Sequence, residues 1–102
     1  METAKELLCE LREEIAVIDK QLVSFWKVRM RLAKQLAECK SELGLPVTDR
    51  EQERLLWEKW QGFLADMELD EELKVLFDAV LSSSKRRQSH FATALYLEKK
   101  NS

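Results

Sequence analysis

From residue 8 to residue 43, a pattern of inward positions three or four residues apart runs without a slip, and all of them except Arg29 are apolar. This spacing places them along one side of an α-helix, and neither Pro nor Gly interrupts the segment before "GLP" at 44–46. The pattern predicts a single helix over about residues 5–43, roughly 55–60 Å long at 1.5 Å per residue. The inward positions, called the seam here, are Leu8, Leu11, Ile15, Ile18, Leu22, Phe25, Arg29, Leu32, Leu36, Cys39 and Leu43.

Two further helices are predicted after this break. Thr48 and Glu51 have the spacing of a capping box, so Thr48 is expected to cap a short second helix that ends before Gly62. Its apolar side comprises Leu55, Leu56, Trp57 and Trp60. Asp70 is expected to cap a third helix, because acidic residues follow it in the first turn. One face of that helix carries Leu73, Phe77, Val80, Ser84, Gln88, Phe91 and Leu95.

The fold class follows from these patterns together with the scarcity of turn residues. The 102 residues include only two Gly and one Pro, so residues 1–102 are expected to form one all-α domain of three helices. A three-helix chain of this size buries only a modest core by itself. The long apolar helix therefore predicts a partner subunit, most simply a second copy of the chain.

Charge and composition exclude several function classes. The 17 basic and 19 acidic residues are interspersed and give a formal charge of −2, which is not the pattern of a nucleic-acid-binding surface. No apolar run is long enough for a signal peptide or a membrane span, so a cytoplasmic location is expected. His90 is the single histidine, and the sequence shows no metal-binding motif and no cofactor motif.

Four polar residues occupy positions where apolar side chains would pack better. Arg29 lies in the seam, and Lys40 follows it by eleven residues, which places both side chains within about 20° of each other around the helix. Ser84 and Gln88 are four residues apart and share one face of the third helix. Three of them have an ordinary structural explanation: an Arg in a seam often sets the helix register, and Ser84 with Gln88 often marks a partly exposed face.

Asp49 and Glu53 form a carboxylate pair at the start of the second helix. By themselves they are typical first-turn acids that complement the helix dipole. A buried cation without a partner is costly, however, and the seam offers few acids to pair with Arg29. An anionic ligand bound among these groups would supply the missing charge.

The order and spacing of these residues resemble a known family. From "ELREEIAVIDKQLVSF" through "VRMRLAKQLAECKSELGLPVTDREQE" to "SSSKRRQ", the chain is similar to the all-helical class of chorismate mutase. The resemblance implies an intertwined three-helix homodimer with shared active sites. It also implies an isomerase of the shikimate pathway and aromatic amino acid biosynthesis, which converts chorismate into prephenate without a cofactor.

The resemblance also implies a role for individual residues. Arg12 resembles the arginine that reaches into the partner's pocket to hold a substrate carboxylate, and Arg29 resembles the one that binds the other carboxylate within its own pocket. Ser84 matches the serine near a carboxylate. Lys40 and Gln88 resemble the pair that hydrogen-bonds the ether oxygen of the substrate.

The second helix carries both matches and departures. Asp49 and Glu53 match positions near the substrate hydroxyl. The family usually has "D-x-x-R-E", whereas "DREQE" places Gln52 where that arginine belongs, which would change binding or substrate preference. Lys85 replaces a residue that is commonly apolar, so it is expected either to swing outward or to make the pocket more basic.

The implied reaction suits these residues, because an intramolecular rearrangement needs no nucleophile or metal. The enzyme must hold a flexible dianion in its reactive conformer and stabilise negative charge on the ether oxygen. Two other functions stay open: a related lyase that removes pyruvate from isochorismate, and a non-catalytic helical dimerisation or binding module. The basic segment "SSSKRRQSH" is expected to be mostly helix surface, with a basic docking patch as the alternative.

Overall fold

The structure is a computed structural model that describes residues 1–64 and 67–101. Over these ranges the chain forms α1 (Ala4–Leu43), α2 (Arg50–Phe63), the short 3-10 helix η1 (Met67–Leu69) and α3 (Asp70–Asn101), with no strand. The predicted all-α class with three helices is therefore confirmed. Within the described ranges, none of the helices combines the length and hydrophobicity that a membrane crossing requires.

The first helix is continuous over 40 residues, as its spacing predicts. Thr3 caps its start, because the Thr3 hydroxyl accepts a hydrogen bond of 3.1 Å from the backbone N–H of Glu6. Gly44 ends it in the left-handed conformation, at φ 69°, which a residue with a Cβ adopts only at a cost. In this turn the N–H of Leu45 donates to the carbonyl of Lys40 over 2.8 Å.

The predicted cap of the second helix is wrong by one residue. Asp49 is the N-cap of α2, and its Oδ1 atom accepts a hydrogen bond of 3.1 Å from the backbone N–H of Gln52. Thr48 precedes the cap, and the helix continues through Gly62 to Phe63. Thr and Asp are both favourable caps and here they are neighbours, so spacing alone does not choose between them.

The third helix begins at Asp70, directly after η1, so Asp70 is its first residue and not its cap. The buried residues of α3 are Phe77, Ser84 and Gln88, all on the predicted face. The Phe77 ring centroid lies 5.0 Å from that of Trp57 and 5.2 Å from that of Trp60. Through these aromatic contacts α2 packs against α3, and this packing sets the position of the α2 N-terminus.

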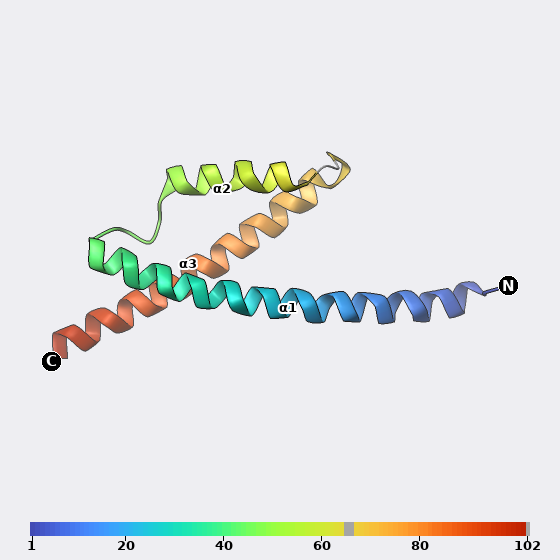
Figure 1. The fold of residues 1–102 in the computed structure, drawn as a ribbon, viewed down its shortest axis with the longest axis horizontal. Helices are drawn as coiled ribbons and strands as arrows, with labels where there is room; N and C mark the ends of the chain where they lie inside the picture. Colours follow the sequence, from blue (N-terminus) through green and yellow to red (C-terminus); the bar gives the residue numbers. More distant parts are fainter. Residues whose placement is uncertain (65–66, 102) are drawn as a thin grey trace.

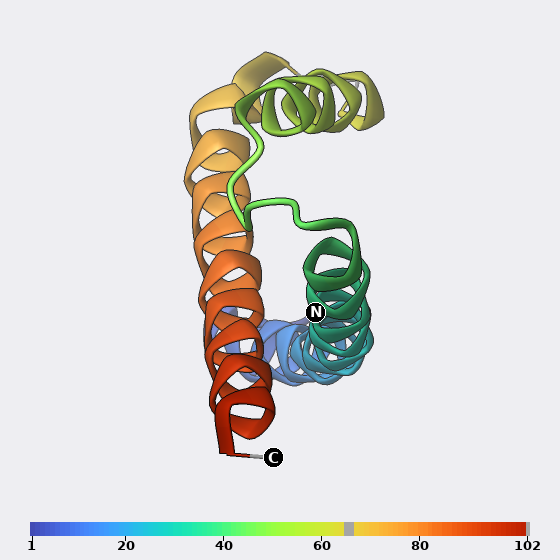
Figure 2. The same ribbon diagram turned by 90° about the vertical axis from the view of Figure 1, so that its left-hand side faces the viewer.

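The helices form an open arrangement of 69 × 29 × 14 Å. Figure 1 shows α3 running diagonally across α1, with α2 lying apart from α1. Both α1 and α2 pack against α3. The N-terminal half of α1 projects alone beyond the crossing, and Figure 2 shows the same separation of α1 and α2 from the side.

The hydrophobic core of the described chain is small. Its buried apolar residues are Ala33, Ala37 and Phe77. Most of the apolar seam stays in water, with Phe25 75% exposed and Leu22 53% exposed. An apolar surface of this length is unusual for a protein that works as a monomer.

Candidate active site

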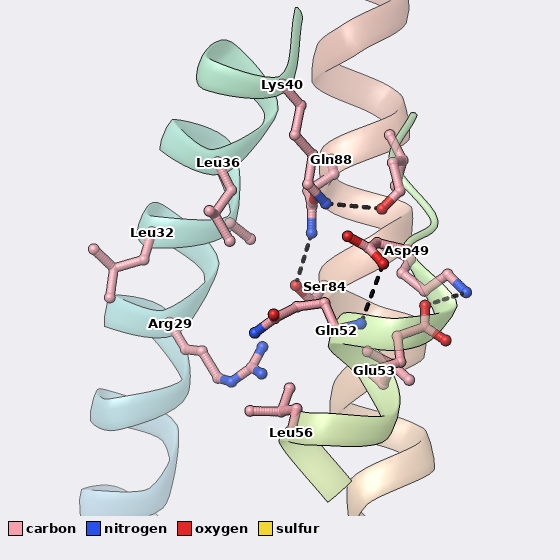
Figure 3. A pocket seen from close by; sticks show the side chains of 14 residues that line it. Arg29, Leu32, Leu36, Lys40, Asp49, Gln52, Glu53, Leu56, Ser84 and Gln88 are labelled. Atoms are coloured by element: carbon pink, nitrogen blue, oxygen red, sulfur yellow. Dashed lines mark hydrogen bonds and ion pairs between the residues drawn. The ribbon is translucent and has the colours of Figure 1, made fainter. Parts of the chain in front are cut away.

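A pocket with a volume of about 420 Å³ lies between α1, the start of α2 and α3 (Figure 3). Every polar site residue predicted from the sequence except Arg12 lines it. Arg12 is exposed on the projecting half of α1. The lining comprises Arg29, Leu32, Ala33, Leu36, Lys40, Val47, Asp49, Gln52, Glu53, Leu56, Leu81, Ser84, Lys85 and Gln88.

Lys40 lies in the last turn of α1 and is held at the edge of the pocket by two acceptors. Its Nζ atom donates to the backbone carbonyl of Val47 and to Oε1 of Gln88, both over 2.8 Å. An ammonium group has three N–H donors, so one remains for a ligand. Because the two acceptors belong to the α1–α2 loop and to α3, the cation is positioned before any ligand binds.

Gln88 continues this network on α3. Its Nε2 atom donates to Oγ of Ser84 over 3.2 Å, and the two residues are only 4% and 5% exposed. The amide nitrogen carries two N–H donors, so one is left after the bond to Ser84. Likewise, the Ser84 hydroxyl accepts from Gln88 and keeps its own proton to donate. Lys40, Gln88 and Ser84 therefore form a connected set of donors across the α1–α3 contact.

Arg29 is a half-buried cation that forms no hydrogen bond or ion pair with the described residues. Burial removes water from its guanidinium and lowers the pKa of Arg29 from its usual value, although the group stays protonated at neutral pH. Figure 3 shows the guanidinium pointing into the space between α1 and α2. A bound carboxylate would give it the missing partner, and the planar guanidinium is suited to bidentate contact.

The first turn of α2 supplies the opposite wall. The Asp49 carboxylate caps the helix, and the Gln52 amide points into the pocket toward Arg29 (Figure 3). Lys85 does not swing outward; it lines the pocket, and its Nζ atom lies 2.9 Å from Oε1 of Glu53. Since these two charges neutralise each other, Arg29 and Lys40 are the cations left for an anionic ligand.

Sequence reasoning missed two parts of this pocket. The Val47 carbonyl that holds Lys40 is a backbone group, so no side-chain pattern reveals it. The apolar wall includes Leu56 and Leu81. Leu81 was detectable in principle, because it precedes Ser84 by three residues and therefore shares its face of the helix.

The pocket has the chemistry of an anion-binding site with preset hydrogen-bond donors. Two separate cations approach it from α1, donors of Gln88 and Ser84 approach it from α3, and four leucines line the space between them. Neither Cys nor His lines it. Across the described residues, His, Cys, Asp and Glu nowhere gather in a group of three or more that would hold a metal ion.

Comparison with known proteins identifies the family. Residues 11–89 match the family model described as chorismate mutase type II. A chorismate mutase from Methanocaldococcus jannaschii is 29% identical over 87 residues, which cover 84% of this chain and 88% of that protein. A bifunctional chorismate mutase/prephenate dehydratase from Aquifex aeolicus is 43% identical over 54 residues, which cover 53% of this chain and 15% of that protein. No solved structure matches the chain significantly. Because the family model spans most of the sequence, the chain belongs to the chorismate mutase type II family, as the resemblance seen in its sequence implied.

Proposed function

We propose that the pocket between the three helices catalyses the rearrangement of chorismate to prephenate. In this reaction one C–O bond breaks and one C–C bond forms within a single molecule, so no nucleophile, proton donor or co-reactant is required. The observation that carries the proposal is the pairing of Lys40 with Gln88 at one end of the pocket, opposite the unpartnered Arg29. Family membership supports the same activity.

Each group has a defined task in this mechanism. Arg29 binds one substrate carboxylate and holds the dianion in its folded, reactive conformer. The free N–H groups of Lys40 and Gln88 donate to the ether oxygen, on which negative charge grows as the C–O bond breaks. In the proposed mechanism Ser84 donates to a carboxylate, and Asp49 and Glu53, at the start of α2, are assigned to the substrate hydroxyl.

We also propose a homodimer that completes the pocket. On one continuous helix Arg12 and Arg29 are 17 residues apart, about 26 Å, which is too far for both to bind one small dianion. Antiparallel pairing of two α1 helices would bury the exposed seams and bring Arg12 of one chain to the pocket of the other. The projecting half of α1 supports this arrangement, because no part of its own described chain covers it (Figure 1). We further propose that the enzyme works in the cytoplasm and serves aromatic amino acid biosynthesis.

Assay of the purified protein with two substrates tests the activity. Chorismate should disappear with formation of prephenate, whereas isochorismate should persist without release of pyruvate. Pyruvate release from isochorismate would instead assign the lyase function. Gln52 keeps this alternative open, because it lines the pocket where the mutase family usually has an arginine. Loss of neither substrate would leave a non-catalytic dimerisation module.

Gln88→Glu should make the activity depend on pH. A carboxyl group donates to the ether oxygen only when it is protonated, so the introduced Glu would serve as a donor below its pKa and lose that role above it. The value of kcat should therefore fall about tenfold or more as the pH rises through that pKa, and recover at lower pH. The pH profile of kcat, compared with wild type, measures this. An identical profile would place Gln88 outside the reacting region.

Lys85→Met should weaken substrate binding more than it slows the chemical step. The substitution removes the ammonium group that lies 2.9 Å from the Glu53 carboxylate. The Glu53 side chain is only 24% exposed, so its unpaired negative charge would repel the dianionic substrate. We expect a rise in KM of about three- to tenfold with a smaller change in kcat, since the pair is partly screened by water.

A matched control separates this effect from loss of any ion pair on α3. Asp78→Asn removes the Lys74–Asp78 pair of 2.8 Å, which lies outside the pocket, but keeps Lys74 against the Trp57 and Phe77 rings, and it should leave KM unchanged. Adding Glu53→Gln to Lys85→Met removes the unpaired carboxylate and should restore part of the affinity. A KM that is the same in the single and double variants would contradict the proposed neutralisation.

A further inference from the structure

A second groove, with a volume of about 720 Å³, lies along the α1–α3 contact outside the candidate active site. Cationic side chains dominate it, and neither Asp nor Glu lines it. The lining residues are Trp26, Lys27, Met30, Arg31, Lys34, Ser83, Arg86, Arg87 and His90. It includes part of the basic segment "SSSKRRQSH". Of this segment, only Ser84, Lys85 and Gln88 line the candidate active site.

The positive charge of this groove is not neutralised within the described chain. Among the described residues, none of its Lys and Arg side chains forms a hydrogen bond or an ion pair. The ammonium group of Lys34 lies over the aromatic ring of Phe91, with Nζ 4.9 Å from the ring centroid. Such a concentration of cations on a chain of net charge −2 creates a local positive field that attracts anions.

The groove and the active site lie on different sides of the same helix contact. At 100° per residue, Lys27 and Arg31 each leave α1 about 160° away from Arg29. In the proposed dimer, the two α1 helices contact each other through the seam, which is the side of α1 that carries Arg29. Pairing through the seam would therefore leave these side chains accessible, and an anion bound among them would not contact the reacting substrate.

We propose that this groove binds a small molecule with two or more linked phosphate groups. Five Lys and Arg side chains and His90 surround one cavity, and a phosphate presents more negative charge and more acceptor oxygens than a carboxylate of similar size. The volume lies in the range of small-molecule sites, about 300–1,000 Å³. Trp26, 43% exposed, adds a flat face on which a nucleobase can stack.

Calorimetric titration of the full chain tests the proposal with inorganic tripolyphosphate, ATP and phosphate-free adenosine. Tripolyphosphate should bind, and its Kd should weaken as the salt concentration rises. Tighter binding of ATP would identify a nucleotide, and equal binding would identify the phosphate chain alone; both results support the site. Adenosine should bind far more weakly than either.

Paired variants assign the binding to this groove. Arg31→Gln with Arg87→Gln should weaken the Kd for tripolyphosphate at least about tenfold, equivalent to 1.4 kcal/mol. Lys5→Gln with Lys20→Gln removes the same net charge from the exposed part of α1 and should leave the Kd within about twofold. Neither pair lines the candidate active site, so both proteins should keep chorismate turnover, which also confirms that they fold.

Three results would overturn the proposal. The first is no heat of binding for tripolyphosphate or ATP up to about 1 mM, the weak end of specific affinity. The second is an equal loss of affinity in both variant pairs, which would make the effect one of net charge. The third is tighter binding of a poly-glutamate peptide than of tripolyphosphate, which would assign the groove to an acidic protein segment.

Discussion

Lys40→Ala should lower kcat by roughly 10² or more, about 2.7 kcal/mol of transition-state stabilisation, while the protein remains folded. Lys40 is held by the Val47 carbonyl and by Gln88, so its remaining N–H is fixed in the pocket. Negative charge develops on the ether oxygen mainly in the transition state, and loss of this donor should therefore affect kcat more than KM. Steady-state kinetics with chorismate measure both constants.

Folding of the Lys40→Ala protein must be checked separately, because the substitution also removes two hydrogen bonds between elements. Circular dichroism and a thermal melt show whether the helices persist. Lys20→Ala offers a matched control, since Lys20 lies on the exposed side of α1 and outside the pocket. A folded Lys40→Ala protein with a kcat equal to that of the control would refute the role of Lys40.

Arg12→Ala and Lys40→Ala proteins should each be nearly inactive, yet regain activity when they are refolded together. In a mixed dimer, the chain that keeps Lys40 receives an intact Arg12 from its partner, so one pocket is complete and the other lacks both residues. Random pairing at equal amounts makes about half of the dimers mixed, and about a quarter of the wild-type pockets should return. Turnover per pocket after co-refolding measures this recovery.

The matched control uses two residues of one pocket. Lys40 and Gln88 of the same chain are hydrogen-bonded to each other, so every pocket in a mixture of Lys40→Ala and Gln88→Ala proteins lacks one of them. That mixture should show no recovery. If the first mixture contains mixed dimers but stays inactive, Arg12 does not complete its partner's site.

Much of the fold was predictable because its causes are local. The long helix follows from an apolar spacing that no Pro or Gly interrupts, and it ends at Gly44, where the left-handed conformation favours glycine. The face of α3 was likewise predictable, since residues three and four apart on a helix must share a side. The cap of α2 was not, because Thr48 and Asp49 are adjacent and both are favourable caps.

The sequence also determined which kinds of groups the site contains. Arg29, Lys40, Ser84 and Gln88 stood out because each occupies a position where an apolar side chain would pack better. Their number and chemistry already indicated a small anionic ligand. Spacing within a helix relates residues on one element only, however, so it left the distances between elements open.

The tertiary structure decided which of these groups interact. The crossing of α1 and α3 brings Lys40 within 2.8 Å of Gln88, which is 48 residues away in the chain. Packing of α2 on Phe77 places Glu53 beside Lys85, so a lysine that the sequence left ambiguous becomes half of an ion pair. The same crossing gathers Arg31 and Arg87 on the other side of the contact. Helical periodicity is set by backbone geometry within one segment, whereas these contacts depend on how separate helices pack, and that depends on the shapes of side chains far apart in the sequence.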